Sequence, residues 1–194
     1  MIRVVACAFI AGAVLLSVGC GVGTKYVYVS DIPSKAGISY GNGVSGFSVS
    51  DHRKDKSLMV RYSGVLDENS ALIVHPALIR NRYVIGEDFG QCVEQRLKSS
   101  IKCNGSSAGE AAGRVFVEIR SISMDASPVS NGSGGINVMM AYDVFHGSGT
   151  NRQSNTIRTR VATADGEAEA DRLIARALSA AVDDLIAETK SYID

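Results

Sequence analysis

The sequence contains no tryptophan, and aromatic side chains make up only 6% of it. Proteins that stack nucleic-acid bases or sugar rings need more aromatic side chains than this. The sequence also lacks an excess of charge of either sign, because 20 basic residues balance 20 acidic ones. Without net positive charge, the chain has little long-range attraction for phosphate backbones. We therefore expect no nucleic-acid partner.

The N-terminus lacks a segment long enough to span a bilayer. One charge, Arg3, precedes an apolar run over residues 4–16, which is shorter than a membrane-spanning helix and typical of a removable export signal. The run ends in Leu16-Ser17-Val18-Gly19-Cys20, which resembles the lipobox of bacterial lipoproteins. The alternative is an ordinary signal peptide in which Cys20 has no special role.

The lipobox resemblance implies that the mature chain begins at Cys20, which then carries diacylglycerol and a further acyl chain such as palmitate. Each buried CH₂ group contributes about 0.8 kcal/mol, so these chains give lasting membrane attachment. By resemblance to enterobacterial sorting, Gly21 favours the outer membrane over the inner membrane. The rest of the chain is then expected to face the periplasm.

Composition divides the chain into three parts. Residues 1–19 are the expected signal peptide, and residues 20–42 combine the lipidated cysteine with a glycine- and serine-containing stretch expected to be a flexible spacer. Within that spacer, residues 26–29 can add an edge strand. Residues 43–194 are long enough for one periplasmic domain with a substantial core.

Hydrophobic periodicity predicts an α+β domain. Helices are expected at 86–101 and 167–192, where apolar residues recur every three or four positions. Alternating patterns predict strands at 44–50, 58–65, 71–75, 114–124, 136–145 and 156–161, the last three forming an antiparallel meander. The simplest arrangement is a two-layer sandwich, with a mainly antiparallel sheet packed against two helices.

Only two of the four cysteines, Cys92 and Cys103, lie within the expected domain. In an oxidising compartment such a pair can form a disulfide. Cys92 falls inside the helix expected at 86–101, so the chain would have to turn back to bring the two Cα atoms within about 7 Å. A disulfide and two separately buried thiols both remain open.

The order of these parts resembles the YajG-like family of bacterial lipoproteins over residues 44–190. The clearest correspondences are the strand that runs into Asp51-x-Arg53 and the terminal stretch from Ala177 to Glu188. That family has no established activity, so the resemblance implies none. The layout is more distantly similar to the lipoprotein subunit of the outer-membrane lipopolysaccharide translocon.

Few residues suggest a catalytic, metal-binding or anion-binding site. The three histidines are scattered and lack metal-ligand spacing, so we expect no catalytic residues, no metal and no cofactor. Asp51 and Arg53 are expected to pair with each other or to cap the turn after their strand. Arg120, Arg158 and Arg160 can share one sheet face, either as an anion- or partner-binding patch or as an ordinary solvated surface.

The sequence thus predicts a lipid-anchored, non-enzymatic envelope protein that binds or scaffolds an envelope assembly. Its expected partners are an envelope protein and the membrane, which it contacts through the lipid on Cys20. The serine- and glycine-rich loop at 125–135 is expected either to contact a partner or simply to be mobile. A lipid- or glycolipid-binding accessory subunit of an envelope transport system is the alternative function.

Overall fold

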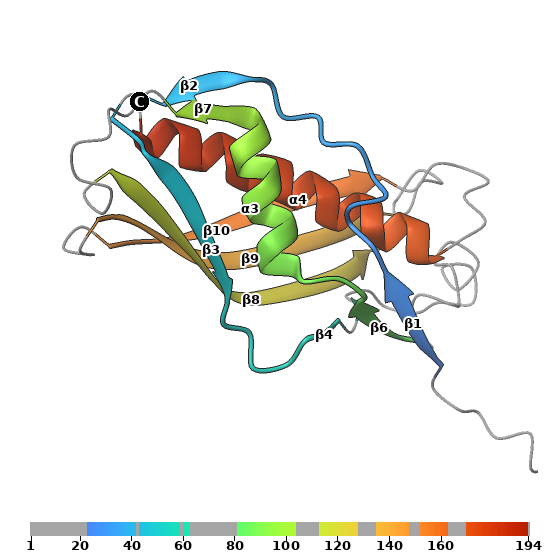
Figure 1. Ribbon diagram of the computed structural model, residues 1–194. Helices are drawn as coiled ribbons and strands as arrows, with labels where there is room; N and C mark the ends of the chain where they lie inside the picture. Colours follow the sequence, from blue (N-terminus) through green and yellow to red (C-terminus); the bar gives the residue numbers. More distant parts are fainter. Residues whose placement is uncertain are drawn as a thin grey trace, which may run out of the picture.

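The computed structural model describes residues 23–41, 43–58, 60–62, 81–103, 113–127, 135–147, 152–162 and 170–193. It has two layers, because both described helices lie on one face of the main sheet (Figure 1). These helices are α3 (Phe89–Ser100) and α4 (Ala170–Ile193). The α+β class and the sandwich arrangement predicted from the periodicity are confirmed.

Among the described residues, the main sheet has five strands in mixed orientation. Its main path runs β10 (Gln153–Ala162), β9 (Gly135–His146), β8 (Arg114–Ser127) and β3 (Gly46–Asp51). The β8–β9–β10 part is the predicted antiparallel meander. Both β3 and the short β5 (Val60–Tyr62) pair in parallel with β8, β3 along its first half and β5 near its end. The sequence pattern did not predict this parallel edge.

The predicted strand at 58–65 is divided in the structure. Ser57–Leu58 forms β4, which pairs antiparallel with β6 (Arg82–Ile85) in a second, smaller sheet, whereas β5 belongs to the main sheet. The side chains of Leu58 and Val60 are both buried, so each sheet gains an apolar residue from this stretch. The partner strand predicted at 71–75 lies outside the described residues.

The helix boundaries follow from capping and from the strand that succeeds α3. The carboxylate of Asp88 accepts a hydrogen bond from the Gln91 backbone N–H at 3.0 Å and so caps the N-terminus of α3. Ile101, predicted as the last helical residue, is instead extended and begins β7 (Ile101–Cys103). Its side chain is buried, and its backbone pairs with β2 (Ser39–Gly41) in a parallel two-stranded sheet.

The described part of the expected flexible spacer, residues 23–41, is a structured part of the domain. β1 (Thr24–Val27) is the predicted edge strand, two residues earlier than expected, and pairs in parallel with β6. Val27 and Val29 are buried in the core, and β2 follows within the same N-terminal arm, residues 23–41. The boundary expected at residue 43 is therefore wrong, because buried valines and backbone pairing hold the arm on the domain.

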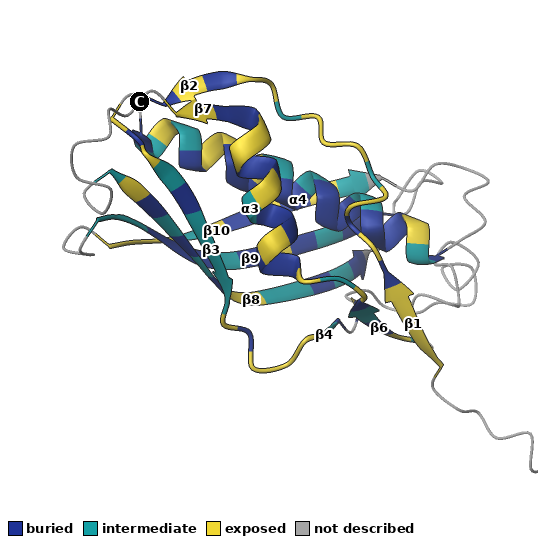
Figure 2. Cartoon of the chain, in the orientation of Figure 1, coloured by how far each residue is buried: buried dark blue, intermediate teal, exposed yellow. Residues whose placement is uncertain are grey.

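The core lies between the sheet and the helices. Alternate residues of β8 and β9 point into it, as the alternation of buried and exposed positions shows (Figure 2). The apolar stripe of α4, including Ile174, Leu178, Val182 and Leu185, packs against this layer and is fully buried. Neither α3 nor α4, nor any other helix in the described ranges, is both long and apolar enough to cross a membrane.

Candidate functional site: the open face of the main sheet

The face of the main sheet opposite the helices is open and polar. Arg120, Met139, Arg158 and Arg160 are all exposed there. A register shift in β8 between Ile119 and Ser121 keeps Ile119 in the core while turning Arg120 outward. The three arginines predicted to share a sheet face therefore do so.

Asp143 lies at the centre of an ion-pair network on this face. Its carboxylate accepts hydrogen bonds from Arg152 Nε at 2.9 Å and from Ser154 Oγ at 2.7 Å, and it lies 3.1 Å from Arg120 Nη2. Arg152 also pairs with Glu118. Although it belongs to the outer face, Asp143 is only 2% exposed, because the arginine side chains lie over it.

The surroundings of Asp143 stabilise its charged form. Burial opposes ionisation, but the hydrogen bonds from Ser154 and Arg152 and the charges of the two arginines outweigh it, so the pKa of Asp143 lies below its usual value. Beside the carboxylate, the rings of Phe116 and Phe145 stack with centroids 5.3 Å apart. The Arg152 guanidinium lies 5.3 Å from the Phe145 centroid. These contacts indicate a structural network that fixes the outer surface of β8, β9 and β10.

Arg158 and Arg160 occupy a different part of the face. They line a hollow of about 360 Å³ together with Asp125, Asn137 and Met139. Neither arginine forms an ion pair with a residue in the described part of the chain. Met139 is 41% exposed, which places an apolar side chain next to two cationic ones. This combination is suited to an acidic protein surface that also offers an apolar contact.

The arginine patch is thus smaller than the sequence suggested. Arg120 is held by Asp143 and contributes to the ion-pair network. Arg158 and Arg160 remain available at the hollow. The positions of the three arginines alone did not predict this division, because the decisive carboxylate, Asp143, lies in a strand whose other residues are mostly apolar. Its outward position in the alternation of 136–145 was the available signal.

A second polar site surrounds Asp51 and Arg53, which pair as predicted. Arg53 Nε and Nη2 donate to the two carboxylate oxygens of Asp51 at 2.9 and 2.8 Å. Arg53 is only 6% exposed, and its guanidinium lies over the ring of Phe89. This geometry joins the end of β3 to the first turn of α3, so we assign the pair a structural role.

Cys92 and Cys103 are not bonded to each other. Cys92 is buried in α3, whereas Cys103 is exposed at the end of β7. The disulfide is therefore absent, and the alternative of two buried thiols is wrong for Cys103. The physical reason is that the chain leaves α3 in an extended conformation at Ile101. The extended β7 carries Cys103 onward from the helix and does not turn back toward Cys92.

The other predicted site residues are less informative. Cys20 lies outside the described residues, as does most of the loop at 125–135. Among the residues with described positions, no group of three histidine, cysteine, aspartate or glutamate side chains is arranged to hold a metal ion. The expectations of no metal, no cofactor and no catalytic residue stay predictions.

Arg96 is the main structural residue that the sequence analysis missed. It lies on the helical face of α3 that was expected to pack into the core, but its charge gave no reason to place it there. In the structure it is 8% exposed and donates to Ser179 Oγ at 2.7 Å and to the carbonyl oxygens of Val29 and Ile32 at 2.5 and 2.6 Å. It therefore joins the N-terminal arm to both helices.

Comparison with known proteins assigns no family. No family model matches the sequence, and no curated protein matches it either. The YajG-like resemblance accordingly stays a prediction.

Several solved structures share the general arrangement at low similarity. An uncharacterized protein is 10% identical, with 90% of this chain and all of that chain covered and a TM-score of 0.42. A protein of the DUF330 family from Xanthomonas campestris is 8% identical, with 86% and 91% covered and a TM-score of 0.42. Rare lipoprotein B from Shewanella oneidensis is 15% identical, with 56% and 83% covered and a TM-score of 0.33. Similarity at this level assigns neither a family nor a function.

Proposed function

We propose that this chain is a lipid-anchored envelope lipoprotein that binds a protein partner through the open face of its main sheet and has no catalytic activity. The proposed location is the periplasmic side of the outer membrane, and this proposal rests on the lipobox at residues 16–20 and on Gly21. The observation that carries the binding role is the hollow at Arg158, Arg160 and Met139.

The hollow supports protein binding for two reasons. Two arginines without ion-pair partners in the described chain are available to an incoming carboxylate, and arginine pairs with carboxylates in a bidentate geometry. The exposed side chain of Met139 adds adaptable apolar surface of the kind found at interaction sites. The partner class that fits is an envelope protein with an acidic surface around an apolar residue.

A photo-crosslinking experiment tests this proposal. A photoreactive amino acid replaces Met139 in the lipidated protein, and the same replacement at Tyr40, which is 64% exposed on β2, is the control. We expect a discrete protein adduct from position 139 and none from position 40. An Arg158→Glu/Arg160→Glu variant should lose the adduct, whereas Lys54→Glu/Lys102→Glu, with the same change in charge at exposed positions, should keep it.

The alternative function is a lipid- or glycolipid-binding accessory subunit of an envelope transport system. It requires an apolar site for an acyl chain, whereas the hollow at Arg158 has charged residues in its lining. If position 139 gives no protein adduct and phospholipid or glycolipid co-purifies with a soluble Cys20→Ala form, the scaffold role is contradicted and the carrier role takes its place.

A further inference from the structure

The structured domain begins close to the proposed lipid anchor. Only residues 21–23 separate Cys20 from Thr24, the first residue of β1. A fully extended chain spans about 3.5 Å per residue, so Thr24 lies within about 14 Å of Cys20. If Cys20 carries lipid, as the proposed function requires, β1 is confined to the neighbourhood of the lipid headgroups.

The arm that contains β1 is firmly attached to the domain. The Glu87 carboxylate accepts hydrogen bonds from the backbone N–H groups of Val29 and Ser30, at 2.5 and 3.0 Å. Asp183 of α4 accepts further bonds from Ser34 Oγ and the Lys35 backbone N–H, at 2.6 and 2.9 Å. The short tether therefore restricts which end of the whole domain meets the membrane.

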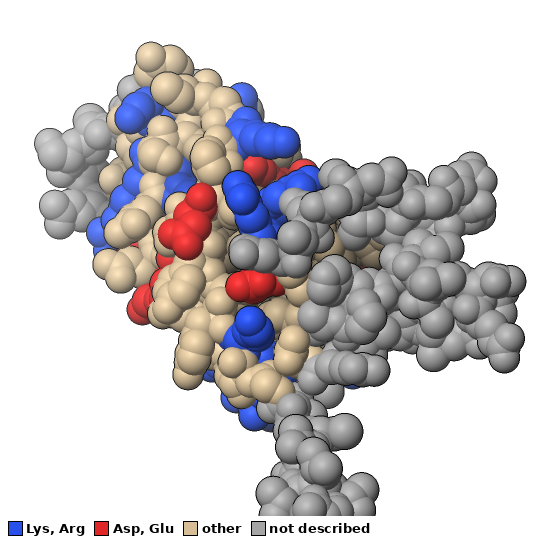
Figure 3. Space-filling model, turned by 90° about the vertical axis from the view of Figure 1, so that its right-hand side faces the viewer, with Lys and Arg blue, Asp and Glu red and all other residues tan. Residues whose placement is uncertain are grey.

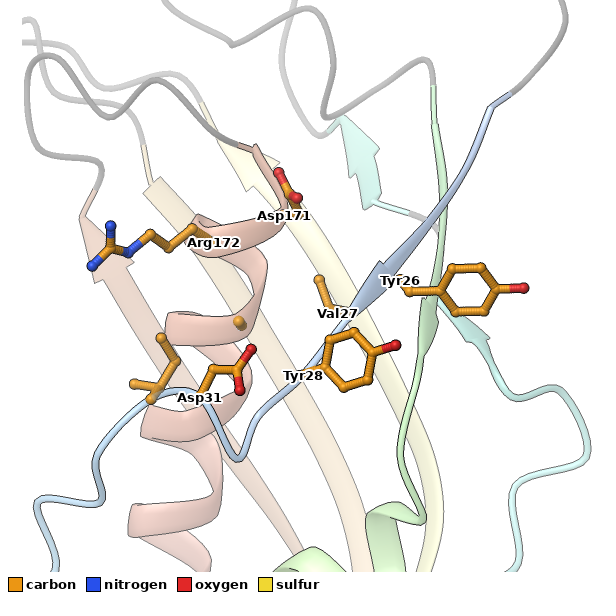
Figure 4. A pocket seen from close by; sticks show the side chains of 8 residues that line it. Tyr26, Val27, Tyr28, Asp31, Asp171 and Arg172 are labelled. Carbon is orange, nitrogen blue, oxygen red and sulfur yellow. The ribbon is translucent and has the colours of Figure 1, made fainter.

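Two tyrosines are exposed at this end. Tyr26, in β1, is 61% exposed, and Tyr28, the residue after the strand, is 43% exposed. Both rings point to the side away from α4 (Figure 4). Val27, between them, is buried. Tyrosine combines an apolar ring with a polar hydroxyl, and it is enriched at the interface between lipid and water for that reason.

The charges around these tyrosines are mixed. Lys25 is exposed beside them, and a hollow of about 330 Å³ at β1 is lined by Tyr28, Asp31, Asp171 and Arg172 among others. Basic and acidic side chains are interspersed over this end of the molecule (Figure 3). The distinguishing feature of this surface is therefore the pair of exposed tyrosine rings, and not an excess of charge of one sign.

We propose that Tyr26 and Tyr28 form a membrane-contact surface that enters the headgroup layer of the bilayer holding the Cys20 lipid. The surface orients the domain, with β1 and the N-terminal end of α4 against the bilayer. The partner is a phospholipid surface, and the inference rests on the proposed lipid anchor at Cys20.

A matched control is available at the other end of the molecule. Tyr40, on β2, is exposed to nearly the same extent as Tyr26. β2 lies near the C-terminal end of α4, where Gly41 faces Ile193, whereas β1 lies near Asp171 at the N-terminal end (Figure 1). A helix of 24 residues is about 36 Å long, so the two tyrosines are well separated.

Tryptophan fluorescence tests the surface directly, because the natural chain has no tryptophan. Lipidated Tyr26→Trp and Tyr40→Trp proteins are reconstituted in vesicles of phosphatidylethanolamine and phosphatidylglycerol, with and without brominated phospholipid. We expect a blue shift and loss of emission for the reporter at position 26. The reporter at position 40 should show neither. Unchanged far-ultraviolet circular dichroism establishes that both variants are folded.

Vesicle flotation separates failure of the surface from failure of the anchor. If the lipidated protein floats with the vesicles but the two reporters are quenched equally, or neither is quenched, the membrane-contact surface is contradicted and the anchor is not. If the protein does not float, and mass spectrometry finds no lipid on Cys20, the proposed anchor is contradicted together with the surface that rests on it.

Discussion

Asp143 shows how one residue can organise a polar surface. Its carboxylate is nearly fully buried and holds Arg120, Arg152 and Ser154. We expect Asp143→Asn to lower the free energy of unfolding at neutral pH by about 2 kcal/mol, because the charge that the arginines and the serine surround is lost. Glu118→Gln, which removes a more exposed partner of Arg152, should change it by no more than about 0.5 kcal/mol. Urea unfolding measures both.

The effect of Asp143→Asn should also depend on pH. Because folding lowers the pKa of Asp143, its stabilisation is complete above the ordinary carboxyl pKa of about 4 and is lost as pH falls through the lowered value. The stability difference between the natural protein and the variant should therefore shrink in acid. A difference that stays constant down to the lowest pH at which both proteins fold would contradict the assignment.

Gly113 illustrates a second constraint at the residue scale. A Cβ atom at this position would lie 2.8 Å from the carbonyl oxygen of Gly43 and 3.2 Å from the backbone nitrogen of Ser45. Since both neighbours are backbone atoms, we expect Gly113→Ala to cost about 1 to 3 kcal/mol of stability. Gly46→Ala, whose nearest contact would be 4.0 Å away, is the control. Thermal unfolding of the two variants should separate them clearly.

At the scale of elements, α3 depends on its N-terminal cap. We expect Asp88→Ala to lower the free energy of unfolding by about 1 kcal/mol, because the Gln91 N–H loses its acceptor. Asparagine is an equally good capping residue, so Asp88→Asn should be close to neutral. Equal losses for the two variants in denaturant unfolding would show that the charge of Asp88, and not its capping bond, is what matters.

The connection between α3 and β7 governs the chemistry of the two cysteines. In a Cys20→Ala form, we expect Cys103 to react with a thiol reagent in the native state, because it is exposed. Cys92 should react only on unfolding, since it is buried and burial raises the pKa of its thiol. Mass spectrometry of the labelled protein distinguishes the two sites. A protein that has no reactive thiol even when unfolded would instead contain the disulfide.

At the scale of the whole molecule, Arg96 joins parts that are distant in the sequence. Its guanidinium bonds the arm at Val29 and Ile32 and the helix α4 at Ser179. We expect Arg96→Met to lower the free energy of unfolding by about 3 kcal/mol, because buried acceptors lose their donor. Hydrogen exchange of the Val29 and Ser30 amides should also become faster as the arm loosens.

Lys98→Met is the control for Arg96→Met. Lys98 is on the same helix but is about half exposed, and its one ion-pair partner among the described residues is Glu94, one turn away. Its replacement should change stability by no more than about 0.5 kcal/mol. If Arg96→Met were as mild as Lys98→Met, the arm would be held by its other contacts, which are the strand pairing, the buried valines and the hydrogen bonds to Glu87 and Asp183. The proposed membrane orientation would then lose one of its supports.

Local sequence patterns were sufficient to predict the elements that have one apolar face and one polar face. The alternation in 114–124, 136–145 and 156–161 and the apolar stripe of α4 predicted the meander and the terminal helix, because each buries one face only. The parallel pairing of β3 with β8 was missed, since pairing between segments about 70 residues apart leaves no local signal. The division of the arginine patch was missed for a similar reason, because Asp143 reaches Arg120 only across the sheet.

The sequence by itself determined the class of the fold and the proposed membrane location, because hydrophobic periodicity and the lipobox are local properties of the chain. The tertiary structure decided the roles of the N-terminal arm and of Arg96. Residues 23–41 read as a spacer when considered alone, since they contain glycine, serine and few long apolar runs. They become part of the domain because elements distant in the sequence bury their valines and supply hydrogen-bonding partners, among them β6, β7 and Arg96.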